Sequence, residues 1–499
     1  MSKHRKYFLI ILIFFVFYCF FLSWSFLFQN VDDAYISYRY GKNLMEGKGL
    51  VYNQGEYVEG YTNFLWTVIT SPFTQIKDID VSIFSSSLGL MFSILNILLL
   101  AAIAKQFNGG THIYYKYLIL LPPLFMAIDD SIAFWAIGGM EFPVYTLFIL
   151  GIVYNYFKLN EKSSHLYYLI IFLMLCTLTR PEGNMIVVIT LIHMFLFRKS
   201  ILKFKKVFLG IIIWYAIFCT VYYGFKFLYY GQLIPNTFYA KGVTDLQMNI
   251  VLGTKYLAMC IGTRIYIFIF ILFIPFKKAF GEFKLSYLLS FVFIYIVYLV
   301  MVGGDWMIAN RFFVPILPML YILSVVGFIN VISKIGIYYN DIVKSQKFAK
   351  ISSAVLAILL FVSTLSLLEY KQLIIKDNNA RYELQWSMFG KWLKLNADPN
   401  TVIAVGPAGK IPYYSELYTI DMWGLNNDYI AKTESKRLQA GHKKFDIEYV
   451  LSLNPEFIIG YAGFTDEDIA PRYEKFNAPE DKYKCDDVVF RLKPEFRKK

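Results

Sequence analysis

The sequence has few of the residues that build metal sites. Its 499 residues include only five cysteines and five histidines. Four cysteines lie in apolar runs and one in a polar region, so their spacing predicts neither a disulfide framework nor a thiolate zinc site. The histidines are scattered, which argues against a His-based metal site or triad. The chain also lacks a Walker or Rossmann fingerprint and shows no internal repeat, which counts against a transporter built from inverted halves.

Charged residues are also scarce. They make up 17% of the chain, against 57% hydrophobic and 19% aromatic residues, and this composition indicates a polytopic membrane protein. The formal net charge of +13 is typical of Lys-rich and Arg-rich cytoplasmic loops rather than of nucleic-acid binding. The N-terminal basic residues precede an apolar run long enough to span a bilayer, with no small-residue cleavage site after it. We interpret that run as a retained first helix.

Apolar runs predict about eleven transmembrane helices. They cover residues 7–28, 81–104, 113–128, 142–157, 166–179, 185–197, 207–229, 265–276, 287–302, 312–332 and 351–368. Lys and Arg collect in alternate loops, which the positive-inside bias places in the cytoplasm. The remaining loops are richer in carboxylates, so we expect them to face outward, and an odd number of spans puts the C-terminal region outside as well.

Two regions follow from this pattern. Residues 1–368 form the predicted membrane domain, with a long first outer loop at 29–80 that contains a surface helix at 34–46 and a hairpin at 50–60. Residues 369–499 form a predicted extracytoplasmic α/β domain. Its expected elements are helices at 381–395 and 447–453 and strands at 401–405 and 456–460.

Two adjacent carboxylates, Asp32 and Asp33, open the first outer loop directly after the first apolar run. A charge at such a boundary is costly if it faces lipid, about 2.5 to 3.5 kcal/mol near the bilayer centre. Consecutive helical residues point about 100° apart, so one carboxylate can face a site while the other is bonded elsewhere. Burial and the like-charged neighbour would raise the pKa of one, which suits a general base. The alternative is that both cap the surface helix; we favour the catalytic role.

Further candidates lie in polar clusters of the outward loops, which should converge on one membrane face. Arg39, Lys241 and Arg311 are candidate phosphate binders, and the alternative for each is contact with lipid head groups. Arg180 and Glu182 are interpreted as a structural ion pair. The candidate substrate-binding residues are Tyr35, Glu59, Asn236, Tyr239, Asp305 and Trp306. For Asp305 and Trp306, which follow two glycines, the alternative is an ordinary turn.

In such a site, the cations would hold a phosphate, the apolar walls would hold a lipid and a carboxylate would activate an acceptor hydroxyl. This combination favours glycosyl transfer from a polyprenyl-phosphate sugar. Such a donor needs no nucleotide, in agreement with the missing nucleotide motifs. Two other hypotheses are a lipid-linked sugar flippase or transporter, which predicts charged residues in mid-span, and a non-catalytic envelope assembly protein, which leaves the carboxylate pair unexplained.

Several long motifs carry a resemblance to a known family. They include DDAYISYRYGKNLMEGKGLVYNQGEYVEGYTNFLW from residue 32, WAIGGMEFPVY from 135, LTRPEG from 178, YYGQLIPNTFYAKG from 229, VGGDWMIANRFFVPILP from 302 and YYSELYTIDMWGLNND from 413. Together they make the chain similar, over nearly its whole length, to the terminal arabinofuranosyltransferase family of polyprenyl-phosphate-dependent GT-C enzymes.

The resemblance implies a GT-C fold in the bacterial inner membrane, with the active site and C-terminal domain extracytoplasmic. It also implies a polyprenyl-phospho-arabinofuranose or related donor, an inverting reaction, an envelope glycan or glycolipid acceptor and an essential aspartate. That aspartate corresponds to Asp32 or Asp33, and Lys241 and Arg311 match basic positions of later outer motifs. The high Lys, Ile, Tyr and Phe content departs from the actinobacterial members, so another sugar or acceptor stays open. The sequence identifies no specific cofactor, and a divalent cation stays open.

Overall fold

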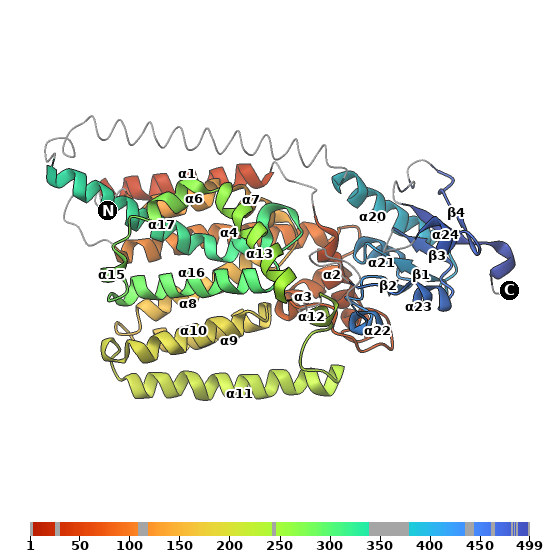
Figure 1. Cartoon of the computed structure of the whole chain (residues 1–499), viewed down its shortest axis with the longest axis horizontal. Helices are drawn as coiled ribbons and strands as arrows, with labels where there is room; N and C mark the ends of the chain where they lie inside the picture. Colours follow the sequence, from red (N-terminus) through yellow and green to blue (C-terminus); the bar gives the residue numbers. More distant parts are fainter. Residues whose placement is uncertain are drawn as a thin grey trace.

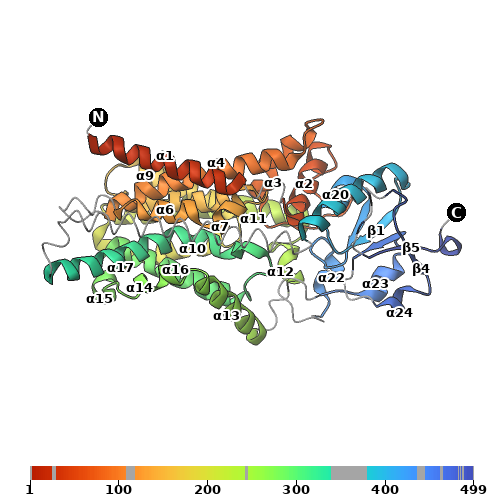
Figure 2. The same cartoon turned by 90° about the horizontal axis from the view of Figure 1, so that it is seen from above.

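The computed structural model describes residues 3–24, 30–107, 118–241, 246–338, 379–434, 444–460, 465–480, 483, 485 and 488–497. Figures 1 and 2 show a long helical bundle with a smaller domain containing a sheet at one end. The N-terminal end of α1 (Lys3–Trp24) and the short helix α15 (Phe276–Ala279) lie at the opposite end of the bundle (Figure 1). The expected last run, 351–368, lies outside the described residues.

The bundle is built from apolar helices whose bounds mostly match the expected runs. Besides α1, these are α4 (Val81–Ala104), α6 (Leu121–Ile128), α7 (Asp130–Ile137), α8 (Phe142–Phe157), α9 (Ser164–Thr179), α10 (Gly183–Leu196), α11 (Phe204–Tyr230), α13 (Leu246–Gly262), α14 (Ile265–Ile271), α16 (Phe283–Met301) and α17 (Leu317–Tyr338). Within the described residues, four helices are long and apolar enough to cross a membrane, or six if two bent pairs each count as one span. The expected number of eleven is therefore not confirmed.

Two local predictions were wrong. Helix α13 was not expected, because Gln247, Asn249 and Lys255 interrupt its apolar pattern. The predicted hairpin at 50–60 contains a turn, in which Glu56 N–H donates to Asn53 O, but no strand. Instead, side chains satisfy part of its backbone, since Asn43 Nδ2 donates to the carbonyl oxygens at 51 and 52.

The first loop after α1 contains the helices α2 (Asp32–Met45), α3 (Phe64–Thr70) and η1 (Ser71–Gln75). Helix α2 matches the expected surface helix but is not a surface element, because most of its middle residues are buried. It lies between the bundle and the C-terminal domain (Figure 1), and it packs against η1, α3 and α21 (Lys410–Ser415). Helix α2 therefore connects the two regions of the molecule through its packing contacts.

The C-terminal domain is built on a five-stranded sheet in the order β2-β1-β3-β5-β4. Strands β2 (Tyr418–Asp421), β1 (Val402–Val405) and β3 (Phe457–Ile459) are parallel to one another. Strand β5 (Val489–Leu492) is antiparallel to both of its neighbours, β3 and β4 (Tyr473–Lys475). The helices are α20 (Asn379–Asn396), α21, α22 (Asp428–Lys432), α23 (Ile447–Ser452) and α24 (Asp466–Ile469). The predicted α/β character, both predicted helices and both predicted strands are confirmed, whereas β2, β4 and β5 were not predicted.

Candidate functional site

The segment after α16 contains left-handed backbone conformations that position Asp305 and Arg311. Gly303 and Gly304 adopt φ angles of 85° and 71°, and a Cβ on Gly304 would lie 2.5 Å from Tyr256 Cβ, so both positions favour glycine. The chain then forms η4 (Ile308–Ile316), in which Ala309 and Asn310 are also left-handed, at φ 59° and 47°. A left-handed non-glycine residue costs about 1 to 2 kcal/mol. This strained turn sets the direction of the next residue, Arg311.

Arg311 joins two carboxylates that are far apart in the sequence. Its Nε and Nη2 each donate to Asp305 at 2.8 Å, and its Nη1 donates to Asp33 Oδ2 at 2.9 Å. The guanidinium is 4% exposed, the Asp305 side chain 3% and the Asp33 side chain 28%. The bidentate pair is the strong form of an Arg–carboxylate contact. Asp33 is therefore the most exposed member of this group.

The two adjacent aspartates have different surroundings. Asp33 faces the bundle, whereas Asp32 accepts hydrogen bonds from Gly409 N–H at 2.9 Å and Lys410 N–H at 2.7 Å of the C-terminal domain. Burial raises the pKa of Asp32 to about 6, and the charge on Asp33 acts in the same direction. The two backbone hydrogen bonds lower this pKa but do not outweigh burial. The N-cap of α2 is Val31 with no side-chain cap. Neither aspartate caps the helix through a hydrogen bond, although both lie in its first turn, where a negative charge is favourable.

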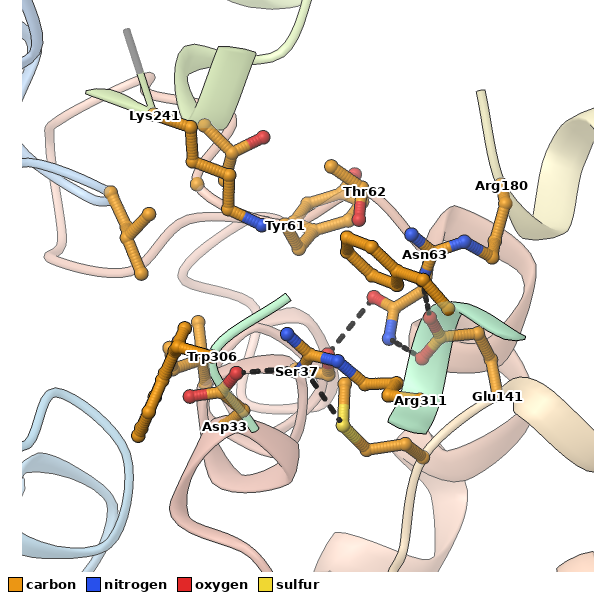
Figure 3. Close-up of a pocket in the computed structure, with 16 residues that line it drawn as sticks. Asp33, Ser37, Tyr61, Thr62, Asn63, Glu141, Arg180, Lys241, Trp306 and Arg311 are labelled. Atoms are coloured by element: carbon orange, nitrogen blue, oxygen red, sulfur yellow. Dashed lines mark hydrogen bonds and ion pairs between the residues drawn. The ribbon is translucent and has the colours of Figure 1, made fainter. Parts of the chain in front are cut away.

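Lys241 supplies a cation of a different kind. It follows the short helix α12 (Asn236–Ala240), and its ammonium lies 5.8 Å from the Phe312 ring centroid. Among the described residues, no acceptor is within hydrogen-bond distance of this ammonium. Burial and the neighbouring Arg311 lower the pKa of Lys241, while Asp305 and Asp33 oppose this. Figure 3 shows Lys241 reaching from α12 into the space that Asp33 and Arg311 border.

A second polar network forms the opposite wall. Asn63 accepts a hydrogen bond from Ser37 Oγ at 2.9 Å and donates to Glu141 Oε2 at 2.8 Å. Glu141 also pairs with Arg180, whose Nη2 binds Glu182 at 3.0 Å (Figure 3). The expected Arg180–Glu182 ion pair is confirmed. Sequence reasoning missed Glu141, although a lone carboxylate after two glycines between apolar runs was a usable signal.

These groups border two adjoining cavities. The smaller, about 70 Å³, is lined by Asp33, Ser37, Asn63, Glu141 and other residues, and the larger, about 360 Å³, is mostly apolar. The two cavities share Thr62, Arg180, Thr237, Lys241, Trp306 and Phe312. A polar chamber therefore meets an apolar one at a cationic boundary, a combination suited to an amphipathic ligand with a charged junction.

Several expected site residues lie elsewhere. Arg39 is buried and donates to Pro412 O at 2.5 Å and Leu417 O at 2.7 Å, so its guanidinium anchors the C-terminal domain. Tyr35 OH donates to Asp80 at 3.1 Å. Neither residue lines the two cavities. Both hold α2 in place.

Three other candidates also lie outside the cavity walls. Glu59 is buried in a 3.0 Å ion pair with Lys226. Asn236 donates to the backbone oxygens of residues 424 and 425, and Tyr239 packs against Phe238. Asp305 lines the larger cavity, and Trp306, 46% exposed, lines both.

The described residues contain no group of three or more His, Cys, Asp or Glu side chains arranged to hold a metal ion. Asp33 and Asp305 already share one cation, the Arg311 guanidinium. The part of the chain that the structure describes therefore offers no evident ligand set for the divalent cation that the sequence left open.

Comparison with known proteins adds the fold. A domain family of unknown function, DUF8728, matches residues 373–492. A search of curated protein sequences finds no significant match. The structure resembles ArnT from Cupriavidus metallidurans bound to undecaprenyl phosphate, with a TM-score of 0.54 and 10% identity over 96% of this chain and 97% of that one.

It also resembles the archaeal oligosaccharyltransferase AglB from Archaeoglobus fulgidus in complex with an inhibitory peptide and a dolichol-phosphate. The TM-score is 0.56, with 12% identity over 92% of this chain and 70% of that one. At such identities the likeness shows the fold, and it confirms the predicted GT-C membrane fold. The arabinofuranosyltransferase subfamily is not confirmed.

Proposed function

We propose that this GT-C protein is a membrane glycosyltransferase, which moves a sugar from a polyprenyl-phosphate donor to an envelope glycan or glycolipid, with inversion. One observation carries the proposal. Asp33 shares a polar cavity with Lys241, and an apolar cavity of about 360 Å³ adjoins it across that lysine. A donor of this class consists of a sugar, a phosphate and an isoprenoid chain joined in that order. The sugar fits the polar cavity, the phosphate fits the position of Lys241 and the isoprenoid chain fits the apolar cavity.

In this arrangement the donor phosphate lies at Lys241. The ammonium has no acceptor among the described side chains, and its lowered pKa reflects a buried charge that an anion would stabilise. Arg311 is held by Asp33 and Asp305, so it orients the carboxylate and adds positive potential. Undecaprenyl phosphate and dolichol-phosphate in the ArnT and AglB complexes support a donor of this class.

Asp33 is the proposed general base. An acceptor hydroxyl attacks the anomeric carbon while the bond from that carbon to the phosphate oxygen breaks, and the electron pair leaves with polyprenyl phosphate. The hydroxyl proton passes to a carboxylate oxygen of Asp33. The geometry supports Asp33 over Asp32 for this role, because both carboxylate oxygens of Asp32 accept backbone hydrogen bonds from the C-terminal domain.

The proposed orientation puts the cavities and the C-terminal domain outside the cytoplasm of a bacterial inner membrane. Lys277 and Lys278 belong to α15, at the end of the bundle opposite the C-terminal domain. Basic residues there match the positive-inside bias. Arabinofuranose, or a related sugar, is the donor sugar that the family resemblance favours.

The test uses purified protein in detergent with synthetic polyprenyl phosphates that carry arabinofuranose or other single sugars, plus envelope extract as acceptor. Release of polyprenyl phosphate with one of these sugars, dependent on the extract, is the expected result. If neither release nor a labelled product is found with any sugar tested, while the protein remains folded, the proposal is overturned.

A further inference from the structure

The C-terminal domain contributes a wall to the smaller cavity. Among the described residues lining it, Leu425 is the member from that domain, whereas Asp33, Ser37 and Asn63 come from the first loop. Leu425 lies between β2 and α22 and is half-buried. An apolar side chain from a separate domain thus borders the chamber that contains the proposed base.

The turn that carries Leu425 is fixed from two sides. Asn236 Nδ2 donates to Gly424 O at 2.9 Å and to Leu425 O at 3.0 Å, which ties the turn to α12. On the other side, Asn426 comes so close to Gly60 that a Cβ on Gly60 would lie 2.0 Å from Asn426 Oδ1. The turn therefore has little freedom to withdraw from the cavity.

The size of the chamber limits what it can hold. Each water needs about 10 to 15 Å³ of such space and has a share of about 30 Å³ in the liquid. The cavity of about 70 Å³ thus holds about five to seven waters, which occupy on the order of 150 to 200 Å³ as liquid. One sugar ring displaces about that much water. A second ring, or a bulky substituent, would exceed this space and would have to extend past Leu425, into the adjoining cavity or into solvent.

We propose that Leu425 is a specificity-determining residue, which limits the size of the sugar accepted beside Asp33. The inference rests on the proposed function, because it takes the smaller cavity as the place of the donor sugar. Leu425 acts by excluding volume, since its branched end cannot hydrogen-bond to sugar hydroxyls. Shortening the side chain should therefore favour larger sugars.

The experiment compares synthetic polyprenyl phosphates that carry a pentose, a hexose or a disaccharide on the same lipid. For each variant, the rate of polyprenyl phosphate release with the larger sugar is divided by the rate with the smaller one. Leu425→Ala should raise the hexose-to-pentose ratio by roughly 10-fold, the lower end of what one methylene contributes in an apolar pocket. Leu425→Trp should lower it. Leu453→Ala, 39% exposed in the same domain, should leave it unchanged.

The two donors of each ratio are assayed on the same protein preparation, so any loss of folded protein cancels in the ratio. If Leu425→Ala is too unstable, Leu425→Val and Leu425→Met give smaller steps in volume. A ratio that stays constant across the active variants, or loss of turnover with every donor throughout the series, overturns the inference. Failure of the proposed function is distinct, because wild-type protein would then release polyprenyl phosphate from none of the donors.

Discussion

The buried arginines Arg311 and Arg264 each bridge a pair of carboxylates, yet of these two clusters only that of Arg311 lines a cavity. Arg311 joins Asp305 and Asp33. Arg264 binds Asp129 through Nε at 2.8 Å and Nη2 at 3.0 Å, with Asp130 at 3.5 Å. The clusters are nearly the same in composition and geometry. Their difference shows what separates a structural ion pair from a candidate site.

The Arg264 cluster is saturated by its neighbours. Ser131 Oγ accepts from Arg264 at 2.7 Å, and Tyr321 OH donates to Asp129 at 2.8 Å. Asp129 also caps α7, and Arg264 precedes α14 at a 91° bend. This cluster lines neither of the two cavities, as far as the described residues define them. An intramembrane ion pair alone is thus weak evidence of function; an adjoining cavity and an unsatisfied cation are stronger evidence.

The largest expected effect comes from Asp33→Asn. We expect turnover of the preferred polyprenyl-phospho-sugar to fall by roughly 10²- to 10⁴-fold, the usual contribution of a general base. The melting temperature should change little, because Asp305 still neutralises Arg311. Initial rates and thermal unfolding of the same preparation test both statements. Near wild-type turnover in this variant, with loss of turnover in Asp32→Asn, would assign the base to Asp32 instead.

Arg264→Met should affect stability rather than chemistry. Removing the guanidinium leaves the charge of Asp129 buried without its partner, which costs about 3 to 5 kcal/mol. The melting temperature in detergent should drop clearly, whereas the rate per folded molecule should stay near that of the wild type. A selective loss of turnover at unchanged stability would place the Arg264 cluster in the reaction, as we propose for the Arg311 cluster.

Lys241→Met should weaken donor use by about 10- to 150-fold in kcat/KM, since a hydrogen bond to a charged group contributes about 1.5 to 3 kcal/mol. Inhibition by free polyprenyl phosphate should weaken in parallel, because the product carries the same phosphate. Lys278→Met is the matched control, since that side chain is 78% exposed at the far end of the bundle. Equal effects of both substitutions would contradict a specific phosphate site at Lys241.

The smallest effect concerns pH and the contact between domains. The pKa of Asp32 is raised to about 6, so the folded state favours the protonated carboxyl. Its stability contribution is therefore complete below pH 4 and is lost as the pH rises through 6. Burial raises the pKa of Glu383 to about 7, although the charge of Lys410 opposes this, so Glu383 acts in the same direction. Melting temperatures between pH 4 and 8 should decline less steeply between pH 4 and 6 in Asp32→Asn; an unchanged slope would contradict this origin.

Topology made part of the site predictable from the sequence. Alternate loops must lie on one face of a membrane bundle, so Asp33, Lys241 and Arg311 could be expected together, and most helix bounds follow apolar runs. The separate roles of Asp32 and Asp33 could not be predicted, because they depend on a contact with Gly409, 377 residues away. Arg39 was predicted to bind phosphate because its partners Pro412 O and Leu417 O lie in the C-terminal domain, far away in the sequence.

Other parts left no local signal. Leu425 is an ordinary apolar residue whose place in the cavity depends on how the C-terminal domain docks. Helix α13 carries polar residues that interrupt a hydropathy pattern, and the segment at 50–60 has alternating residues whose backbone is bonded by side chains of α2 rather than by a second strand. For Leu425 and the segment at 50–60, contacts with other elements decide what the local pattern does not show.

The close approach at Gly409 has a consequence for the history and engineering of this chain. A Cβ there would lie 1.9 Å from the backbone oxygen of Asp32, so a residue remote from the reacting groups admits no side chain without moving the segment next to the proposed base. A different C-terminal domain fused to this bundle would dock in the same way only if it had glycine at the position of Gly409. Substitutions elsewhere in the two regions are less constrained, but the residue at 409 and the backbone at Asp32 must remain compatible with each other.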